Sequence, residues 1–127
     1  MSVGRVDLVR AVQILASIEG VQMDPAALAQ DVLAVADAWP AADEFRLAIA
    51  STRRVLERLV SGAAEGTPLK YNLSAWSSLH YQHKRSQGQR ADMRVIYQRT
   101  EDGAGVRVRG FGHRHVPQDV YRRLQGR

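Results

Sequence analysis

The sequence predicts an α+β fold in which an antiparallel sheet packs on a helix, with an N-terminal helical extension. Apolar residues recur at helical spacing through residues 5–39, whereas several stretches after residue 45 alternate between apolar and polar side chains. Three of the alternating stretches follow one another with short links, which favours an antiparallel meander. A chain of 127 residues is long enough for one modest core.

Residues 1–42 are predicted to form two helices. The first spans residues 5–19, where apolar side chains recur every three or four positions. The second is expected to begin at Asp24, because Pro25 then takes a first-turn position in which its missing N–H costs nothing. It should end before Pro40, since the residue preceding a proline is pushed out of the helical region.

Residues 43–127 are predicted to form a second unit, the main domain. Phe45, Leu47 and Ile49 alternate with their neighbours, which indicates an opening strand. Residues 101–105 are acidic and rich in glycine, and they are expected to close a hairpin. The expected elements are a strand at 45–50, a helix between Ser51 and Gly62, strands at 76–84, 93–99 and 106–112, and a final helix opened by Pro117.

Charge is unevenly distributed along the chain. Residues 1–44 carry two arginines and seven acidic residues, a net charge of −5. Residues 45–127 carry sixteen lysines and arginines and six acidic residues, a net charge of +10. So basic a segment has the electrostatics of a polyanion binder, because its cations gain affinity by releasing counterions from phosphates. The alternative is a basic surface that is merely solvated.

Two roles are open for the acidic residues 1–42. They could lie over the basic part of the chain as a tethered lid. Alternatively, the two helices extend the core or form a homodimer interface, which is what amphipathic stripes usually indicate. Deleting them separates the two roles, because a lid predicts greater activity and a packing element predicts less folded protein.

Composition excludes several classes of protein. The chain has no cysteine, so it contains neither disulfides nor thiolate metal sites. No stretch approaches the roughly 18 consecutive apolar residues of a membrane-spanning helix. The first residues lack the charged and apolar regions of a signal peptide. We therefore expect a cytoplasmic protein with no membrane partner.

Cations and imidazoles concentrate in the predicted strands. Alternation places Arg107 and Arg109 on one strand face, opposite Val106 and Val108. A meander also brings Arg94 and Arg114 onto neighbouring strands, where both could contact one phosphate. The cations and imidazoles within the 36 positions 80–115 include His80, His83, Lys84, Arg94, Arg107, Arg109, His113, Arg114 and His115.

A set of this kind can cleave RNA without a metal. A base removes the proton of the 2′-hydroxyl, whose oxygen then attacks the adjacent phosphate. Cations stabilise the transition state, and an acid protonates the departing 5′-oxygen. The structural alternative is that Arg94 pairs with Asp92 and that the histidines lie in surface loops. His113 and His115 share a strand face, but no nearby carboxylate completes a ligand set, so we expect no metal and no other cofactor.

Four stretches resemble the RelE/ParE superfamily of bacterial type II toxins. Residues 45–59 are similar to the opening strand and first helix of that family, and residues 68–78 to the segment leading into its second strand in the YoeB-like branch. Residues 92–97 match the central strand, which carries an arginine three residues before a tyrosine. Residues 112–121 match the closing strand and tail. The resemblance covers about two thirds of the chain and implies the RelE-like microbial RNase fold.

The resemblance also implies roles for individual residues. Arg94 matches the arginine that contacts the scissile phosphate, and Arg114 matches the cation that steadies the transition state. Tyr121 resembles the tail tyrosine that orients a base, although one extra residue separates it from Arg114. His115 or His113 lies near the position of a histidine that acts as an acid in YoeB-like members.

The general base is less well matched. Lys84 falls where RelE-like members use strand lysines and could help to deprotonate the 2′-hydroxyl. YoeB-like members carry a glutamate directly before the Pro-Leu-Lys motif, where this chain has Thr67, and Glu65 lies two residues earlier. The remaining cations expected to bind RNA are Lys70, His83, Arg85, Arg107 and Arg109.

The resemblance implies a toxin of a type II toxin–antitoxin system. Such a toxin would be an mRNA interferase, a metal-independent endoribonuclease that depends on the ribosome. Its partners would be messenger RNA, the ribosome and a cognate antitoxin. Two alternatives are a ParE-like inhibitor of DNA gyrase and a catalytically inactive binding protein of RelE fold. The histidines and arginines at the end of the closing strand favour the nuclease.

Overall fold

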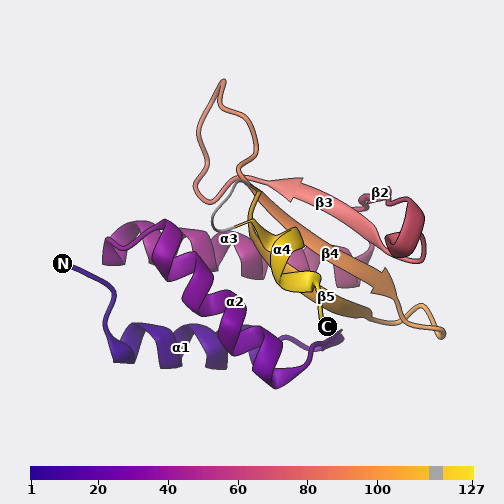
Figure 1. Cartoon of the computed structure of the whole chain (residues 1–127), viewed down its shortest axis with the longest axis horizontal. Helices are drawn as coiled ribbons and strands as arrows, with labels where there is room; N and C mark the ends of the chain where they lie inside the picture. Colours follow the sequence, from indigo (N-terminus) through magenta and orange to yellow (C-terminus); the bar gives the residue numbers. More distant parts are fainter. Residues whose placement is uncertain (115–118) are drawn as a thin grey trace.

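The computed structural model describes residues 1–114 and 119–127. In these residues, helices lie on both sides of a five-stranded sheet, which is an α+β architecture. The helices are α1 (Arg5–Ala16), α2 (Pro25–Ala38), α3 (Ala42–Ser61), the short 3-10 helix η1 (Tyr71–Leu73) and α4 (Val120–Leu124). The strands are β1 (Val21–Gln22), β2 (Thr67–Pro68), β3 (Ser77–Tyr81), β4 (Met93–Arg99) and β5 (Val106–His113). Helices α1 to α3 lie on one side of the sheet and α4 on the other (Figure 1).

The centre of the sheet is the antiparallel meander that the sequence predicts. The strand order is β1-β5-β4-β3-β2, and β4 pairs with β3 on one side and β5 on the other. The register shifts between Ile96, which pairs with Gly110, and Tyr97, which pairs with Val108. The two edge strands are two residues long, too short to show a pattern, and the sequence did not predict them.

The strand predicted at residues 45–50 is wrong, because these residues belong to α3. Phe45, Ala48 and Ile49 are buried at helical spacing, whereas Leu47 is 47% exposed. The alternation that indicated a strand is therefore accidental, and a short apolar run does not separate the two periods. Ser51, where the sequence predicts the helix to begin, lies inside α3, and its hydroxyl donates to the His83 carbonyl at 2.9 Å.

The other boundaries differ by a few residues. The first helix ends at Ala16 rather than at residue 19. The second begins as predicted, since the Asp24 carboxylate accepts from the N–H of Ala27 at 3.0 Å. The final helix is capped by Asp119, whereas Pro117, its predicted start, lies outside the described residues.

The N-terminal helices share a core with the sheet. Leu15 of α1 and Val32 and Val35 of α2 lie in the same buried cluster as Leu56 of α3 and Phe111 of β5. β1, which joins α1 to α2, also pairs with β5. These contacts favour the packing role over the lid, while the division of the chain at residue 42 stays a prediction.

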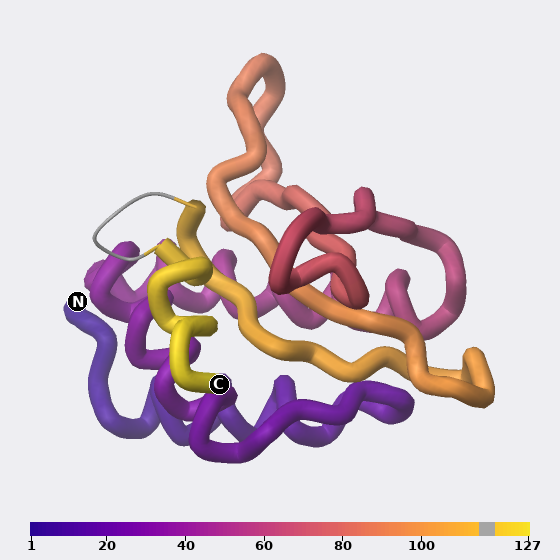
Figure 2. The backbone as a smooth tube through the Cα atoms, turned by 45° about the vertical axis from the view of Figure 1, so that its right-hand side comes forward, coloured from indigo at the N-terminus to yellow at the C-terminus, as the bar shows by residue number. Residues whose placement is uncertain are grey.

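The opposite face of the sheet, the open face, is only partly covered. Ile96 is buried there beneath Val120 and Leu124 of α4. The partly buried residues around them are Leu69, Leu73, Trp76 and Tyr121. Figure 2 shows that residues 82–92, between β3 and β4, form a loop projecting away from the body of the molecule. Within the described part of the chain, no helix combines the length and apolar character needed to cross a membrane.

Candidate functional site

Two neighbouring strands bring His80 and Arg94 side by side. His80 on β3 is the cross-strand partner of Arg94 on β4. Arg114 follows β5 directly, and its backbone N–H donates to the carbonyl of Asp92 at 3.1 Å, at the start of β4. The predicted convergence of Arg94 and Arg114 is therefore supported by the register of the meander, with His80 as the third member.

Tyr121 reaches the same place from α4. Its ring lies 5.4 Å from the guanidinium carbon of Arg94, a cation–π contact. Its hydroxyl donates to the Ser78 Oγ on β3 at 3.3 Å. The Tyr121 side chain is thus held by contacts of both its hydroxyl and its ring. We call His80, Arg94, Arg114 and Tyr121 the open-face site.

Arg94 is the least satisfied member of this group. Its guanidinium is partly buried, and its Nε has no hydrogen-bond partner in the described part of the chain. A buried donor without a partner costs about 1–3 kcal/mol. The predicted alternative, an ion pair with Asp92, is not formed, because the Asp92 carboxylate instead faces His83. The charge of Arg94 is therefore not neutralised by Asp92.

His80 is suited to accept a proton. Partial burial, followed by the charges of Arg94 and Arg114, lowers the pKa of His80 below its ordinary value. At neutral pH the imidazole is therefore uncharged, although the residue is exposed to solvent. The sequence places His80 among the strand cations but assigns it no role, because only the register shows which histidine faces Arg94.

Three of the predicted residues lie on the helical side instead. The His83 ring stacks on Trp39 with centroids 4.2 Å apart, and its two nitrogens face the carboxylates of Asp92 and, at 2.8 Å, Glu44. His113 lies 5.3 Å from the same Trp39 ring. Lys84 donates to Glu44 at 2.8 Å.

The Glu44 contact bears on the choice of base. The hydrogen bond and charge of Glu44 raise the pKa of Lys84, so this lysine stays protonated and is a poor proton acceptor. In turn Lys84, and then His83, lower the pKa of Glu44. These contacts exist because Glu44 lies in the first turn of α3, a segment that the sequence analysis placed next to a strand.

The other predicted residues are spread over the surface. Glu65, Lys70 and Arg85 are exposed, and no hydrogen bond or ion pair ties their side chains to another residue that the structure describes. Arg107 and Arg109 share a strand face as predicted, with Val106 and Val108 buried on the other. His115 lies outside the described residues.

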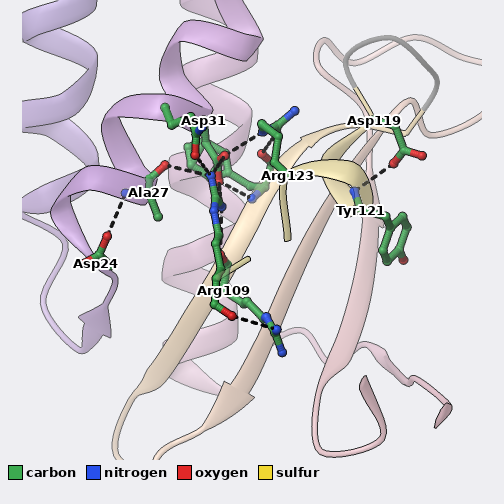
Figure 3. A network of polar contacts seen from close by, with 10 residues as sticks. Asp24, Ala27, Asp31, Arg109, Asp119, Tyr121 and Arg123 are labelled. Carbon is green, nitrogen blue, oxygen red and sulfur yellow. Dashed lines mark hydrogen bonds and ion pairs between the residues drawn. The ribbon is translucent and has the colours of Figure 1, made fainter. Parts of the chain in front are cut away.

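A buried carboxylate anchors α4 and thereby Tyr121. Asp31 of α2 is fully buried and accepts from the N–H of Phe111 at 3.0 Å (Figure 3). It also accepts from Arg123 Nε at 2.8 Å and from Arg127 at 2.6 and 3.0 Å. Both arginines continue to β5, Arg123 to the carbonyl of Phe111 and Arg127 to that of Arg109. No local pattern distinguishes Asp31 from a solvated helix residue, and the sequence did not single it out.

Similarity to known proteins gives no information about the open-face site. No protein-family model, curated protein or solved structure matches this chain. The open-face site offers two arginines whose charges both act on His80, and an aromatic ring beside Arg94.

Proposed function

We propose that this chain is a RelE-like toxin that cleaves messenger RNA as a metal-independent endoribonuclease, working on the ribosome. The observation that carries the proposal is the partly buried Arg94, whose Nε lacks a hydrogen-bond partner among the described residues and which lies across the strand from a histidine of lowered pKa. Arginine is well suited to hold a phosphate, because its planar donors match two phosphate oxygens at once.

The proposed reaction uses the open-face site directly. The neutral His80 takes the proton of the 2′-hydroxyl, whose oxygen attacks the phosphorus as the bond to the 5′-oxygen breaks. Arg94 and Arg114 stabilise the charge that builds up on the phosphate. Tyr121 offers its ring to an adjacent base. The departing oxygen takes a proton from an acid, the role that the sequence suggests for His115.

This assignment changes one role and keeps the others. His80 replaces Lys84 and Glu65 as the base, because Lys84 is tied to Glu44 and His80, not Glu65, is the strand partner of Arg94. The products are a 2′,3′-cyclic phosphate and a 5′-hydroxyl end, because the attacking nucleophile is the neighbouring 2′-oxygen. A cognate antitoxin and the ribosome remain the proposed partners, and the cytoplasm the proposed location.

Cleavage of a reporter messenger RNA in a translating extract tests the proposal. We expect cuts within the reading frame that appear with the intact chain, require ribosomes and leave 5′-hydroxyl ends. The Arg94→Ala variant serves as the inactive reference. An intact chain that leaves the RNA whole but blocks supercoiling by DNA gyrase would replace this proposal with the gyrase inhibitor.

The pH dependence of cleavage should report His80. Because its pKa lies below 6.5, the rate should rise with pH along a limb whose midpoint is below that value and then level off. Removing a neighbouring cation with Arg114→Gln should raise the pKa and move the limb to higher pH. Titration of the His80 ring by NMR measures the same shift without any substrate. A ring that titrates at or above 6.5 in the unaltered chain would contradict this assignment.

A further inference from the structure

A groove runs between α2 and β5, beyond the open-face site. Its volume is about 1130 Å³. One wall is formed by the first half of α2 and residues 22–24 before it. The other is formed by β5, by the segment before β3 and by residues 126–127. The residues that matter for the argument are Met23, Ala26 and Leu33 on the first wall and Trp76, Arg107 and Arg109 on the second. We call it the α2–β5 groove.

The second wall is positively charged. The Arg109 guanidinium carbon lies 5.3 Å from the centre of the Trp76 ring, and its Nε is buried without a hydrogen-bond partner in the described residues. Arg107 is exposed and donates to the Gln98 side chain at 2.8 Å. The groove's acidic residue, Asp24, uses its carboxylate to cap α2. Arg109 also donates to the main-chain oxygen of Arg127 at 3.2 Å. No ion pair joins Arg107 to a carboxylate of a described residue, so Arg107 is the more available cation of the groove.

The groove continues the face that carries the open-face site. Trp76 and Tyr121 pack around the same residue, Ile96, and each ring carries an arginine over it. Along β4, four residues separate Arg94 from Gln98, which meets Arg107, a span of roughly 13 Å at the rise of a strand. A polymer bound at Arg94 can therefore reach the groove by crossing one apolar cluster.

We propose that the α2–β5 groove binds the single-stranded RNA that flanks the cleaved phosphate, with Arg107 and Arg109 on its phosphates and Trp76 with the α2 wall against its bases. This inference rests on the proposed nuclease function, which places the cleaved phosphate at Arg94 and therefore the flanking RNA in the groove. Arginines beside aromatic rings form the platforms on which single strands bind, because the rings stack on any base. The α2 wall is built mainly of alanines, which suits flat bases better than the side chains of a helical partner.

Binding of oligonucleotides of two lengths tests the groove. The probes are fluorescein-labelled 2′-O-methyl oligouridylates, which lack the nucleophile and are not cleaved. One has about 12 nucleotides and the other about four, within the site sizes of small single-strand-binding folds. We expect the double variant Arg107→Ala/Arg109→Gln to bind the long probe about tenfold more weakly than the unaltered chain. Its affinity should also fall less steeply with salt concentration, because each lost phosphate contact removes part of that dependence. The short probe should bind equally well to the double variant and to the unaltered chain.

Two further variants keep the test decisive. Arg107→Glu alters an exposed side chain and should weaken binding of the long probe even if the Arg109 variant folds poorly. Arg53→Ala removes an exposed cation of α3, on the other side of the sheet, and should change neither probe. Unchanged affinity and salt slope in both groove variants would overturn the inference.

The outcomes separate this inference from the proposed function. If the groove variants lose long-probe binding while the unaltered chain cleaves no RNA, the groove is supported and the nuclease is rejected. If the unaltered chain cleaves RNA while the groove variants bind the long probe as well as it does, the nuclease is supported and the groove is rejected. Displacement of the long probe by poly-glutamate but not by polyuridylate would overturn the RNA assignment in favour of an acidic protein segment.

Discussion

Replacing Arg94 with alanine is expected to lower the rate of RNA cleavage about 10²- to 10³-fold. The Arg94 Nε has no hydrogen-bond partner among the described residues, and Arg94 lies opposite His80 on the neighbouring strand. In the proposed mechanism, Arg94 anchors the scissile phosphate and supplies part of the charge that stabilises the transition state, and the substitution removes both. Single-turnover cleavage of a reporter RNA measures the effect.

Two other substitutions distinguish a functional from a structural arginine. Arg94→Lys keeps the charge but loses the planar donors, so its rate should fall between those of the unaltered chain and the alanine variant. Arg94→Leu removes a partly buried donor that lacks a partner and loses only a cation–π contact with Tyr121. We therefore expect this inactive variant to keep or increase the free energy of unfolding.

The matched control is Arg53→Ala on α3. Arg53 is exposed and pairs with Glu57 at 3.7 Å, an ion pair of a kind that contributes little stability. Cleavage by this variant should match that of the unaltered chain. If Arg94→Ala cleaved equally well, Arg94 would have no part in the chemistry and the proposed site would be wrong.

Replacing Asp31 with alanine is expected to lower the free energy of unfolding by about 3–5 kcal/mol, the cost of removing one partner from a buried ion pair. Asp31 is fully buried, and its loss leaves Arg123 and Arg127 without their shared carboxylate. It also leaves the N–H of Phe111 without its acceptor, in the part of β5 that the short β1 does not cover and that is therefore an open edge. Urea unfolding followed by circular dichroism measures the change.

Graded variants show which part of the network matters. Asp31→Asn retains an oxygen for Phe111 but loses the charge, so it should destabilise the fold less than Asp31→Ala. Asp24→Ala is the matched control in the same helix, because it removes only a cap worth about 1 kcal/mol. An Asp31→Ala variant no less stable than Asp24→Ala would show that the two arginines do not depend on this carboxylate.

The Asp31 network also has a consequence for the site. Arg123 lies two residues after Tyr121 in the same short helix, and its attachment to Asp31 and Phe111 holds that helix against β5.

Edge strands expose unpaired backbone groups that can recruit other chains. Here the side chains of Asp31, Arg123 and Arg127 satisfy the backbone groups of Phe111 and Arg109 along that edge.

Much of the fold could be predicted because its signals are local. The Asp24-Pro25 start of α2 needs only the geometry of one helical turn. The strands β4 and β5 alternate clearly enough to predict a meander, and with it the approach of Arg94 and Arg114. The helix at residues 42–61 was misread in its first half because Phe45, Leu47 and Ile49 also fit a period of two.

What the sequence determined by itself is therefore the α+β class, most elements and the concentration of cations in the meander. Only the tertiary structure decided which of those cations share a site. The register of β3 against β4 pairs His80 with Arg94, while the start of α3 draws Lys84 and His83 to Glu44. Both are contacts between residues distant in the chain, and local periodicity carries no information about them. The same holds for Asp31, which is polar by sequence and buried only because two arginines more than ninety residues away reach it.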